Sequence, residues 1–312
     1  MYRISLIVLL LTVAGCGPST DPTRGPVSED EPLRVVATTS MIADVVRVVG
    51  GPTVDVTGLM GPGIDPHLYK ASEGDVARMS NADIVFYNGL HLEGKMVEIF
   101  AQMAERGKDV HAVTEGIAPG KYRESELFAG NYDPHVWFDL SLWQDVTRYV
   151  GDRLADRDSV HAAQYRRRAA AYADTIAALH TWTAAKMDGI DPSLRVLITS
   201  HDAFGYFGRA YGVEVRGLQG ISTASEAGTA DVQELAEFVA DRRIPSMFVE
   251  SSISPRGIEA VRAAVRDKGF DVQIGGTLYG DALGPAGSGA DTYLGMMRAN
   301  IATITAGLQH GN

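Results

Sequence analysis

Residues 159–186 of the 312-residue chain read SVHAAQYRRRAAAYADTIAALHTWTAAK. This stretch contains neither proline nor glycine and is rich in alanine, so it predicts one long helix of roughly 40 Å at 1.5 Å per residue. Ser159 is placed to cap the first turn, and Gly189 and Pro192 are expected to end the helix. One apolar stripe repeats at spacings of four and three: Tyr165, Ala169, Tyr172, Ile176 and Leu179. The helix is therefore expected to be a spine that packs along the structure on either side of it.

Four β-branched apolar runs precede this helix, and four more follow it. The runs cover residues 34–39, 54–59, 84–88 and 110–114, then 196–200, 213–218, 247–251 and 272–277. Such runs, alternating with helical stretches, specify parallel sheets covered by helices, and a chain of this length exceeds the usual size of a single core. We therefore expect an α/β fold with two lobes, 33–157 and 190–312, joined by one long spine helix at 158–189. Each lobe is expected to be a four-stranded, mostly parallel sheet flanked by helices.

The N-terminus is typical of a secretory signal. Arg3 precedes a short apolar run at residues 4–14, which is too short for a membrane-spanning anchor. The run ends in TVAGC, which resembles a bacterial lipobox and implies cleavage before Cys16 and lipid attachment to its thiol. We expect residues 1–15 to be a signal peptide and 16–32 to be a lipidated flexible tether, because the latter has too few apolar residues to order itself. The alternative is a cytosolic protein with an apolar start and a buried cysteine.

Charge and cysteine content limit the partners and the metal chemistry. The formal net charge is −11 and the basic residues form no long cluster, so nucleic acid is not an expected partner. Cys16 is the only cysteine, which excludes a disulfide, a zinc–thiolate site or an iron–sulfur cluster within one copy. Any bound metal must therefore have nitrogen and oxygen ligands.

Three of the eight histidines occur in short, distinctive contexts. The tripeptide Asp-Pro-His appears at 65–67 and again at 133–135, and Ser-His-Asp appears at 200–202. Proline restricts both itself and the residue before it, so each Asp-Pro-His presents its imidazole from a stiffened turn. The repeat favours a shared role for these histidines.

The positions of these side chains relative to the strands predict one metal site. His67, His201 and Asp281 follow the second, fifth and eighth strands, where ligands gather in parallel α/β sheets, whereas His135 needs its own loop to return to the cleft. Neutral imidazole and carboxylate suit zinc, manganese and ferrous iron, and three imidazoles with one carboxylate complete a four-ligand shell. The alternative is that each histidine satisfies a loop hydrogen bond and that Asp281 caps the next helix.

Six segments together resemble, in order, those of the zinc and manganese solute-binding proteins of ABC transporters, the TroA-like family. The segments are GIDPHLYK, NGLHLEGKM, NYDPHVWFDL, TSHDAFGYF, FVESS and TLYGDALG. The resemblance implies four metal ligands: His67 in DPH, His135 in DPHVW, His201 in SHDAF and Asp281 in YGDALG. It also implies two lobes joined by one long helix, and a membrane permease and a cytoplasmic ATPase as partners.

Two further residues are candidates for the surroundings of the metal. His91 lies in NGLHLE, where other family members carry glycine, which implies a place near the site without a ligand role. Glu250 ends FVE and is a candidate to accept a hydrogen bond from an imidazole and so fix its tautomer. The alternative for Glu250 is an ordinary salt bridge.

The expected function is that of an extracytoplasmic, lipid-anchored, monomeric receptor that captures zinc or manganese in an inter-lobe cleft and delivers it to an ABC importer. Three imidazoles favour zinc. Residues 112–134 contain no histidine, whereas many zinc-dedicated members of the family carry a long His- and acid-rich loop there, and this favours manganese competence. Ferrous iron is a third candidate.

Two other classes of protein compete with this interpretation. A metal-dependent hydrolase also uses three histidines, but it needs an open coordination position, which Asp281 would fill, and the sequence has no HExxH, GxSxG or phosphate-loop motif. A surface adhesin lipoprotein would fit the signal and the tether equally well. It gives no reason for four ligand-type residues at these positions, and a metal titration separates the two.

Overall fold

The computed structural model describes residues 31–124 and 131–309. The expected signal peptide, most of the tether and the lipidation site Cys16 lie outside the described residues, so these stay predictions. The eight expected strands are all present within two residues of their expected bounds: β1 (Leu33–Ala37), β2 (Val54–Gly58), β3 (Ile84–Tyr87), β4 (Val110–Ala112), β5 (Val196–His201), β6 (Glu214–Gln219), β7 (Ser246–Glu250) and β8 (Gln273–Leu278). The chain is an α/β protein.

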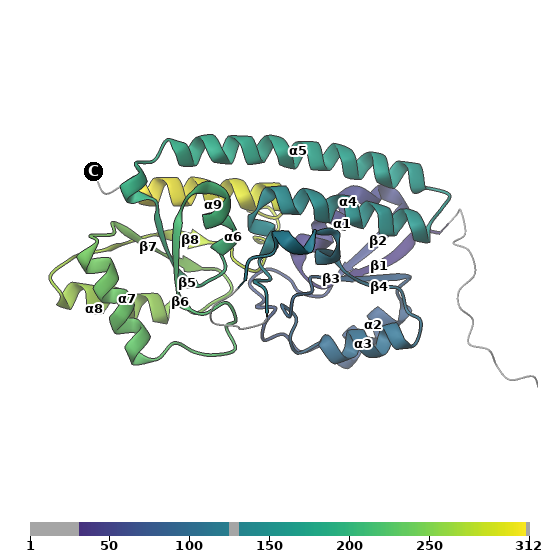
Figure 1. The fold of residues 1–312 in the computed structure, drawn as a ribbon. Helices are drawn as coiled ribbons and strands as arrows, with labels where there is room; N and C mark the ends of the chain where they lie inside the picture. The colour runs from purple at the N-terminus through teal and green to yellow at the C-terminus, as the bar shows by residue number, and fades with distance from the viewer. Residues whose placement is uncertain (1–30, 125–130, 310–312) are drawn as a thin grey trace, which may run out of the picture.

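The first four strands form one parallel sheet in the order β2-β1-β3-β4. The last four differ from the expected single sheet, because they pair as two parallel ladders, β5 with β6 and β7 with β8. Strands β5 and β7 still lie next to each other, so the two pairs share one layer (Figure 1). A register shift between Met247 and Phe248 interrupts the β7–β8 ladder, and such irregularities bend a strand away from regular pairing.

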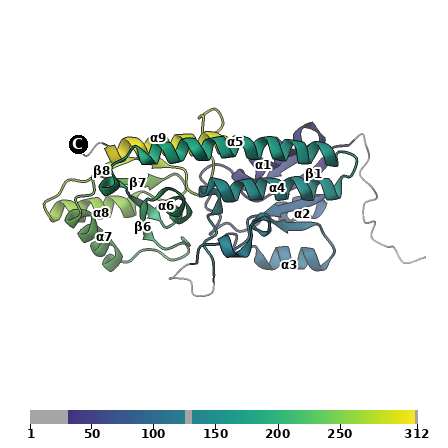
Figure 2. The same ribbon diagram turned by 45° about the horizontal axis from the view of Figure 1, so that its top comes forward.

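Helices cover both faces of these sheets. One side carries α1 (Ser40–Gly50), α4 (Leu140–Arg157), the long α5 (Ala162–Asp188) and α9 (Tyr293–Gln309) (Figures 1 and 2). The other side carries α2 (Glu73–Asn81), α3 (Val97–Glu105), α7 (Thr229–Asp241) and α8 (Arg256–Asp267). The short α6 (Gly205–Tyr211) lies near the middle. Short 3-10 turns occupy Gly51–Thr53, Val113–Gly116, Pro119–Lys121, Val136–Phe138 and Pro192–Leu194. Within the described ranges, none of the helices has the length and apolar character needed to cross a bilayer.

Helix α5 is the predicted spine, with its expected apolar stripe buried. It begins at Ala162, so the predicted cap at Ser159 is wrong. The turn from α4 into α5 is held by Asp158, which follows α4: Oδ1 accepts from the backbone N–H groups of Val160 and His161, and Oδ2 accepts from the Tyr165 hydroxyl at 2.7 Å. One carboxylate therefore holds the turn that leads into α5, whereas the helix itself, with His161 at its N-cap position, has no side-chain cap.

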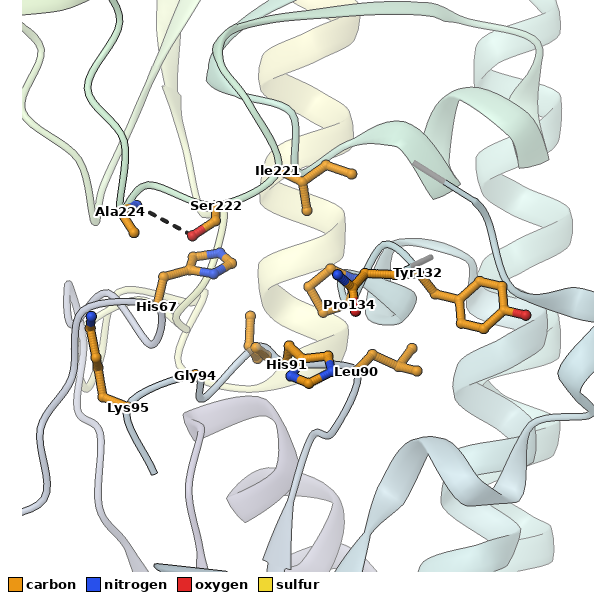
Figure 3. Close-up of a pocket in the computed structure, with 12 residues that line it drawn as sticks. His67, Leu90, His91, Gly94, Lys95, Tyr132, Pro134, Ile221, Ser222 and Ala224 are labelled. Atoms are coloured by element: carbon orange, nitrogen blue, oxygen red, sulfur yellow. Dashed lines mark hydrogen bonds between the residues drawn. The ribbon is translucent and has the colours of Figure 1, made fainter. Parts of the chain in front are cut away.

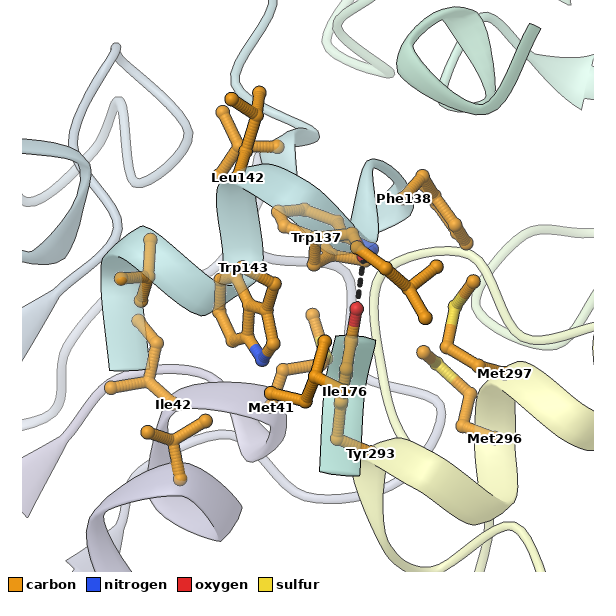
Figure 4. Packing of buried hydrophobic residues seen from close by; sticks show 14 of the residues in the cluster. Met41, Ile42, Trp137, Phe138, Leu142, Trp143, Ile176, Tyr293, Met296 and Met297 are labelled. Atoms are coloured by element: carbon orange, nitrogen blue, oxygen red, sulfur yellow. Dashed lines mark hydrogen bonds between the residues drawn. The ribbon is translucent and has the colours of Figure 1, made fainter. Parts of the chain in front are cut away.

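The N-terminal half (β1 through α4) and the C-terminal half (β5 through α9) share one hydrophobic core. Trp143 of α4 packs against Tyr293 of α9, with Ile176 of α5 beside them (Figure 4). The Tyr293 hydroxyl donates to the carbonyl of Trp137 at 2.6 Å, which satisfies a buried polar group at the junction. Smaller apolar clusters lie under α7 and α8 and under α2 and α3. The halves are thus joined by packed side chains as well as by the spine helix.

Candidate metal centre

Both Asp-Pro-His turns are built in the same way. In the loop after β2, Oδ1 of Asp65 accepts from the backbone N–H of His67 at 2.9 Å. In the loop before α4, Oδ1 of Asp133 accepts from the backbone N–H of His135, also at 2.9 Å. An aspartate that bonds the backbone two residues on closes a tight turn, and the proline between stiffens it. The repeated tripeptide therefore presents each imidazole from a fixed backbone.

The four predicted ligand residues come together between the halves. His201 is the last residue of β5, and Asp281 lies in the loop after β8. One atom from each of the four residues lies within 4.8 Å of the others, and all four are buried. The Nε2 atoms of His67 and His135 are 3.3 Å apart, and Oδ2 of Asp281 is 3.3 Å from Nε2 of His201. Three imidazole nitrogens and one carboxylate thus converge on a single point.

Carboxylates behind two of the imidazoles set the direction of the rings. Oδ1 of Asp133 lies 2.7 Å from Nδ1 of His135, and Oε2 of Glu250 lies 2.9 Å from Nδ1 of His201. Glu250 also accepts from the backbone N–H of His201 at 2.9 Å through Oε1. A Cβ at Gly280 would lie 2.3 Å from Oε2 of Glu250, so glycine leaves room for this carboxylate. With Nδ1 occupied on the outside, each Nε2 faces the centre as metal ligation requires.

The buried environment of Asp281 is the feature of the site that most clearly favours binding of a cation. Neither of its oxygens has a hydrogen-bond donor of good geometry among residues 31–124 and 131–309, although its side chain is fully buried. Oδ1 lies 3.5 Å from Nε2 of His135. A buried carboxylate without donors is strongly unfavourable unless a positive charge lies next to it. The donor set of three imidazoles around this carboxylate fits zinc, manganese or ferrous iron.

Electrostatics prepare the site for an ion. Burial would raise the pKa of Asp281, but the charge of His201, followed by the charges of His135 and His67, holds it well below its usual range. Burial lowers the pKa of His67 to about 3, so this imidazole is neutral. Burial also acts to lower the pKa of His201, but the Glu250 and Asp281 carboxylates raise it well above its usual value. In the metal-free protein, a proton on His201 therefore provides the positive charge that Asp281 needs.

A scan against known families assigns the chain. The model of ZnuA, described as zinc-uptake complex component A, periplasmic, matches residues 35–307. The chain belongs to the ZnuA family. The resemblance to TroA-like receptors in the six sequence segments is thereby confirmed.

Named relatives of the ZnuA family cover almost the whole chain. The zinc-binding protein TroA of Treponema pallidum is 46% identical over 306 residues, 98% of each chain, and its solved structure superposes with a TM-score of 0.86 over 89% of this chain and 99% of that chain. The manganese-binding lipoprotein MntA of Bacillus subtilis is 44% identical over 305 residues, 97% of each chain. SsaB of Streptococcus sanguinis, a metal ABC transporter substrate-binding lipoprotein, is 30% identical over 313 residues, 99% of each chain.

His91 lies near the four clustered residues but is not one of them. It lines, together with His67, a pocket of about 300 Å³ whose far wall includes Ile221 and Ser222 of the C-terminal half (Figure 3). Leu90 and His91 both have left-handed backbones, with φ of 52° and 64°, which is unusual for residues with a side chain. His91 is exposed, whereas the four clustered residues are buried.

Sequence reasoning identified Glu250 behind His201, but it missed the other residues that support the clustered histidines. Asp65 and Asp133 were visible only as part of Asp-Pro-His, and their capping bonds follow from that repeat. Thr223 donates to Oδ2 of Asp65 at 2.6 Å from the other half of the molecule. Arg123 donates to Oδ2 of Asp133 at 2.8 Å. Neither Thr223 nor Arg123 lies in a motif, so no local signal could have identified them.

Proposed function

We propose that this chain is the extracytoplasmic receptor of an ABC importer and binds one zinc or manganese ion through His67, His135, His201 and Asp281. The observation that carries the proposal is the buried carboxylate of Asp281, which lacks donors and faces three imidazole nitrogens. The names of TroA and MntA support both ions. Here the metal is the transported substrate.

The coordination can have four or five atoms. Oδ1 of Asp281 is 3.5 Å from Nε2 of His135, and Oδ2 is 3.3 Å from Nε2 of His201, so both oxygens face the centre. One oxygen gives the tetrahedral shell that zinc takes, and both give a five-atom shell. A site that offers either number supports zinc binding together with manganese competence.

The arrangement favours a receptor over an enzyme. Four protein ligands already complete a tetrahedral shell, whereas a catalytic zinc keeps a position for water. The acids that a hydrolase would need as a base are engaged: Glu250 contacts His201, and Asp202 contacts Arg123. We therefore propose that the chain is not an enzyme. An adhesin role would leave unexplained why three imidazoles and one carboxylate converge on a single buried point.

The partners follow from the proposed transport role. The name of SsaB, a substrate-binding lipoprotein of a metal ABC transporter, supports a permease and its ATPase as partners. That name and the name of MntA also support a lipid anchor at Cys16, a residue outside the described part of the chain. We propose that the protein is held at the outer side of a bacterial membrane, as a monomer, through this anchor.

We further propose that residues 33–157 and 190–312 are two lobes that close little around the ion. Hydrogen bonds already join them at several places, among them Trp137 Nε1 to the carbonyl of Gly280, Leu283 N to Ser40 Oγ, and Thr223 to Asp65. The shared core and the linking helix at 158–189 add stiffness. A molecule joined in this way lacks the flexible crossovers of hinge-closing receptors.

Small-angle X-ray scattering is expected to give superimposable profiles for metal-free and zinc-loaded protein. The cross-lobe hydrogen bonds and the common core keep the halves together in both states. A clear decrease in the radius of gyration on loading would contradict the proposed stiffness. A protein with the substitution Trp143→Ala, which loosens the shared core, serves as a control and is expected to give a larger difference between the two states.

Titration of metal-stripped protein is the test of the proposed function, and it is expected to show one zinc ion bound per chain with the release of about one proton. The proton comes from Nε2 of His201, whose raised pKa keeps it protonated at neutral pH. The apparent affinity should therefore increase about tenfold for each unit by which the pH is raised, until the pH reaches the folded-state pKa of His201. In the metal-free protein the same proton stabilises the fold below the unfolded histidine pKa, and this stabilisation is lost as the pH rises through the folded-state value.

Calorimetry in two buffers of different ionisation enthalpy measures the number of protons released. The substitution Glu250→Gln removes one of the two carboxylates that hold the proton, so this variant should release less than the wild-type protein. Absence of zinc binding would contradict the proposed function. Stoichiometric binding without proton release would contradict only the role of His201.

A further inference from the structure

Arg123 crosses from the N-terminal half to the C-terminal half directly behind the metal site. It lies in the long loop between β4 and α4, and its Nη1 donates to Oδ2 of Asp133 at 2.8 Å. Both Nη atoms also lie 3.4 Å from Oδ2 of Asp202, the residue after His201. The backbone N–H of Arg123 donates to the hydroxyl of Tyr206, and this hydroxyl donates to the carbonyl of Asp133. One arginine thus holds the Asp133 turn against α6.

The C-terminal half leaves a specific space for this guanidinium. A Cβ at Gly205, the first residue of α6, would lie 2.1 Å from Nη1 of Arg123. Any larger residue at Gly205 must therefore displace the arginine. The absence of a side chain there allows Arg123 to lie flat over the start of α6 and to reach both aspartates.

Asp133 depends on Arg123 for its second oxygen. Oδ1 of Asp133 serves His135 twice, at its backbone N–H and at Nδ1, while Oδ2 accepts from Arg123. The side chain of Asp133 is fully buried, so without the arginine one of its charged oxygens would lack this donor. A carboxylate held at both ends fixes the imidazole more tightly than one held at a single end.

We propose that Arg123 is a positioning residue that sets how long the metal stays bound, by holding Asp133, and through it His135, against the C-terminal half. The inference rests on the proposed ligand role of His135. Arg123 does not line the pocket beside His67 but a different groove, which it shares with Asp202 and Gln219. Loss of Arg123 is therefore expected to loosen His135 without changing the pocket beside His67. It should increase the rate at which the ion dissociates more than it changes the rate at which the ion associates.

Stopped-flow measurement of zinc dissociation into excess chelator tests the inference on the full chain. Loss of the direct outer partner of a metal ligand typically costs ten- to a hundredfold in affinity, and Arg123 acts on His135 one step further out, through Asp133. Arg123→Gln is therefore expected to dissociate zinc up to about tenfold faster, the lower end of that range, while the association rate changes by less than about twofold. Arg123→Lys keeps the charge but cannot reach both aspartates, so it should be intermediate.

Arg209 provides the matched control. It also makes contacts across the halves, donating to the carbonyl of Lys121 at 2.8 Å and lying 3.5 Å from Oδ2 of Asp139, but it contacts neither of the carboxylates behind the histidines. Arg209→Gln therefore removes a cross-half arginine without touching Asp133. It is expected to dissociate zinc at the wild-type rate.

A second variant keeps every charge and covers the case in which Arg123→Gln fails to fold. Gly205→Ala displaces the guanidinium by steric contact alone and adds a good helix former to α6. It is expected to dissociate zinc faster in the same way. Asp202→Asn weakens only the contact with the C-terminal half and should give a smaller increase, which is absent when Arg123 is already replaced.

The outcomes separate this inference from the proposed function. Wild-type protein that binds no zinc contradicts the proposed function. Wild-type protein that binds zinc, with Arg123→Gln and Gly205→Ala dissociating it at the wild-type rate, overturns the positioning role alone. Equal acceleration by Arg209→Gln also overturns it, because the effect would then belong to any arginine between the halves.

Discussion

Zinc at about a thousandfold excess over its Kd is expected to raise the melting temperature by roughly 10 °C, and His67→Ala is expected to remove most of this rise. A ligand that binds only the folded state stabilises it by about 4 kcal/mol at that excess. For a chain of this size each kcal/mol corresponds to roughly 2–4 °C. His67 is one of the four proposed ligands, and its Nε2 is 3.3 Å from that of His135, so its removal is expected to leave an incomplete shell and a Kd above the working concentration.

Differential scanning fluorimetry or calorimetry measures this shift. His91→Ala is the matched control, because His91 lines the same pocket as His67 but is not one of the four clustered residues. It should keep nearly the full rise. His135→Ala should lose the rise as His67→Ala does, although it also leaves Asp133 without its imidazole partner. If metal-free His67→Ala does not fold, the histidine is structural and the ligand assignment is contradicted.

The spine helix and the strands were predictable because they depend on local pattern. Tyr165, Ile176 and Leu179 repeat at helical spacing, and burial of that face needs no knowledge of what covers it. The cap at Ser159 was predicted wrongly because the chain makes a further turn before the helix begins at Ala162. Asp158 holds this turn by accepting from the amides of Val160 and His161 and from the Tyr165 hydroxyl. The predicted start was therefore three residues too early, an error of the size expected for helix boundaries read from sequence.

The pairing of the last four strands was beyond sequence reasoning for a similar reason. Their apolar runs predict strands and a parallel direction, and both are found. The β7–β8 ladder itself is irregular, because Gly275 of β8 falls out of register between Met247 and Phe248 of β7. Glycine inside a strand is a sign of such a bulge, but the apolar runs do not say which strands hydrogen-bond to one another.

Some features of the metal centre could likewise be predicted from local sequence, whereas others depend on residues far away in the chain. The repeated Asp-Pro-His and the position of His201 at a strand end were enough to predict which side chains converge. The isolation of Asp281 was not predictable, because a lack of donors is a property of everything packed around a carboxylate. Arg123 was also not predictable, since its contact with Asp133 is possible only because Gly205 in the other half leaves room for the guanidinium.

Zinc is expected to displace manganese from the site at equal free concentrations, with manganese still binding in the absence of zinc and ferrous iron lying between them. The intrinsic affinity of nitrogen and oxygen sites rises from manganese through iron to zinc, and three imidazoles strengthen this preference. The site is not expected to bind zinc alone, because both oxygens of Asp281 face the histidines and can give the higher coordination number that manganese tolerates. The stretch at 112–134 has no histidine that would add a further zinc ligand.

Competitive titration of metal-stripped protein measures this order, and the chain carries its own reporter. The ring centroids of Trp137 and His135 are 5.2 Å apart, so ligation of His135 should change the fluorescence of Trp137. Trp137→Phe should abolish the signal while calorimetry still detects binding. Manganese binding without detectable zinc binding in the micromolar range would overturn the four-ligand assignment itself, because three imidazoles and one carboxylate cannot prefer manganese so completely.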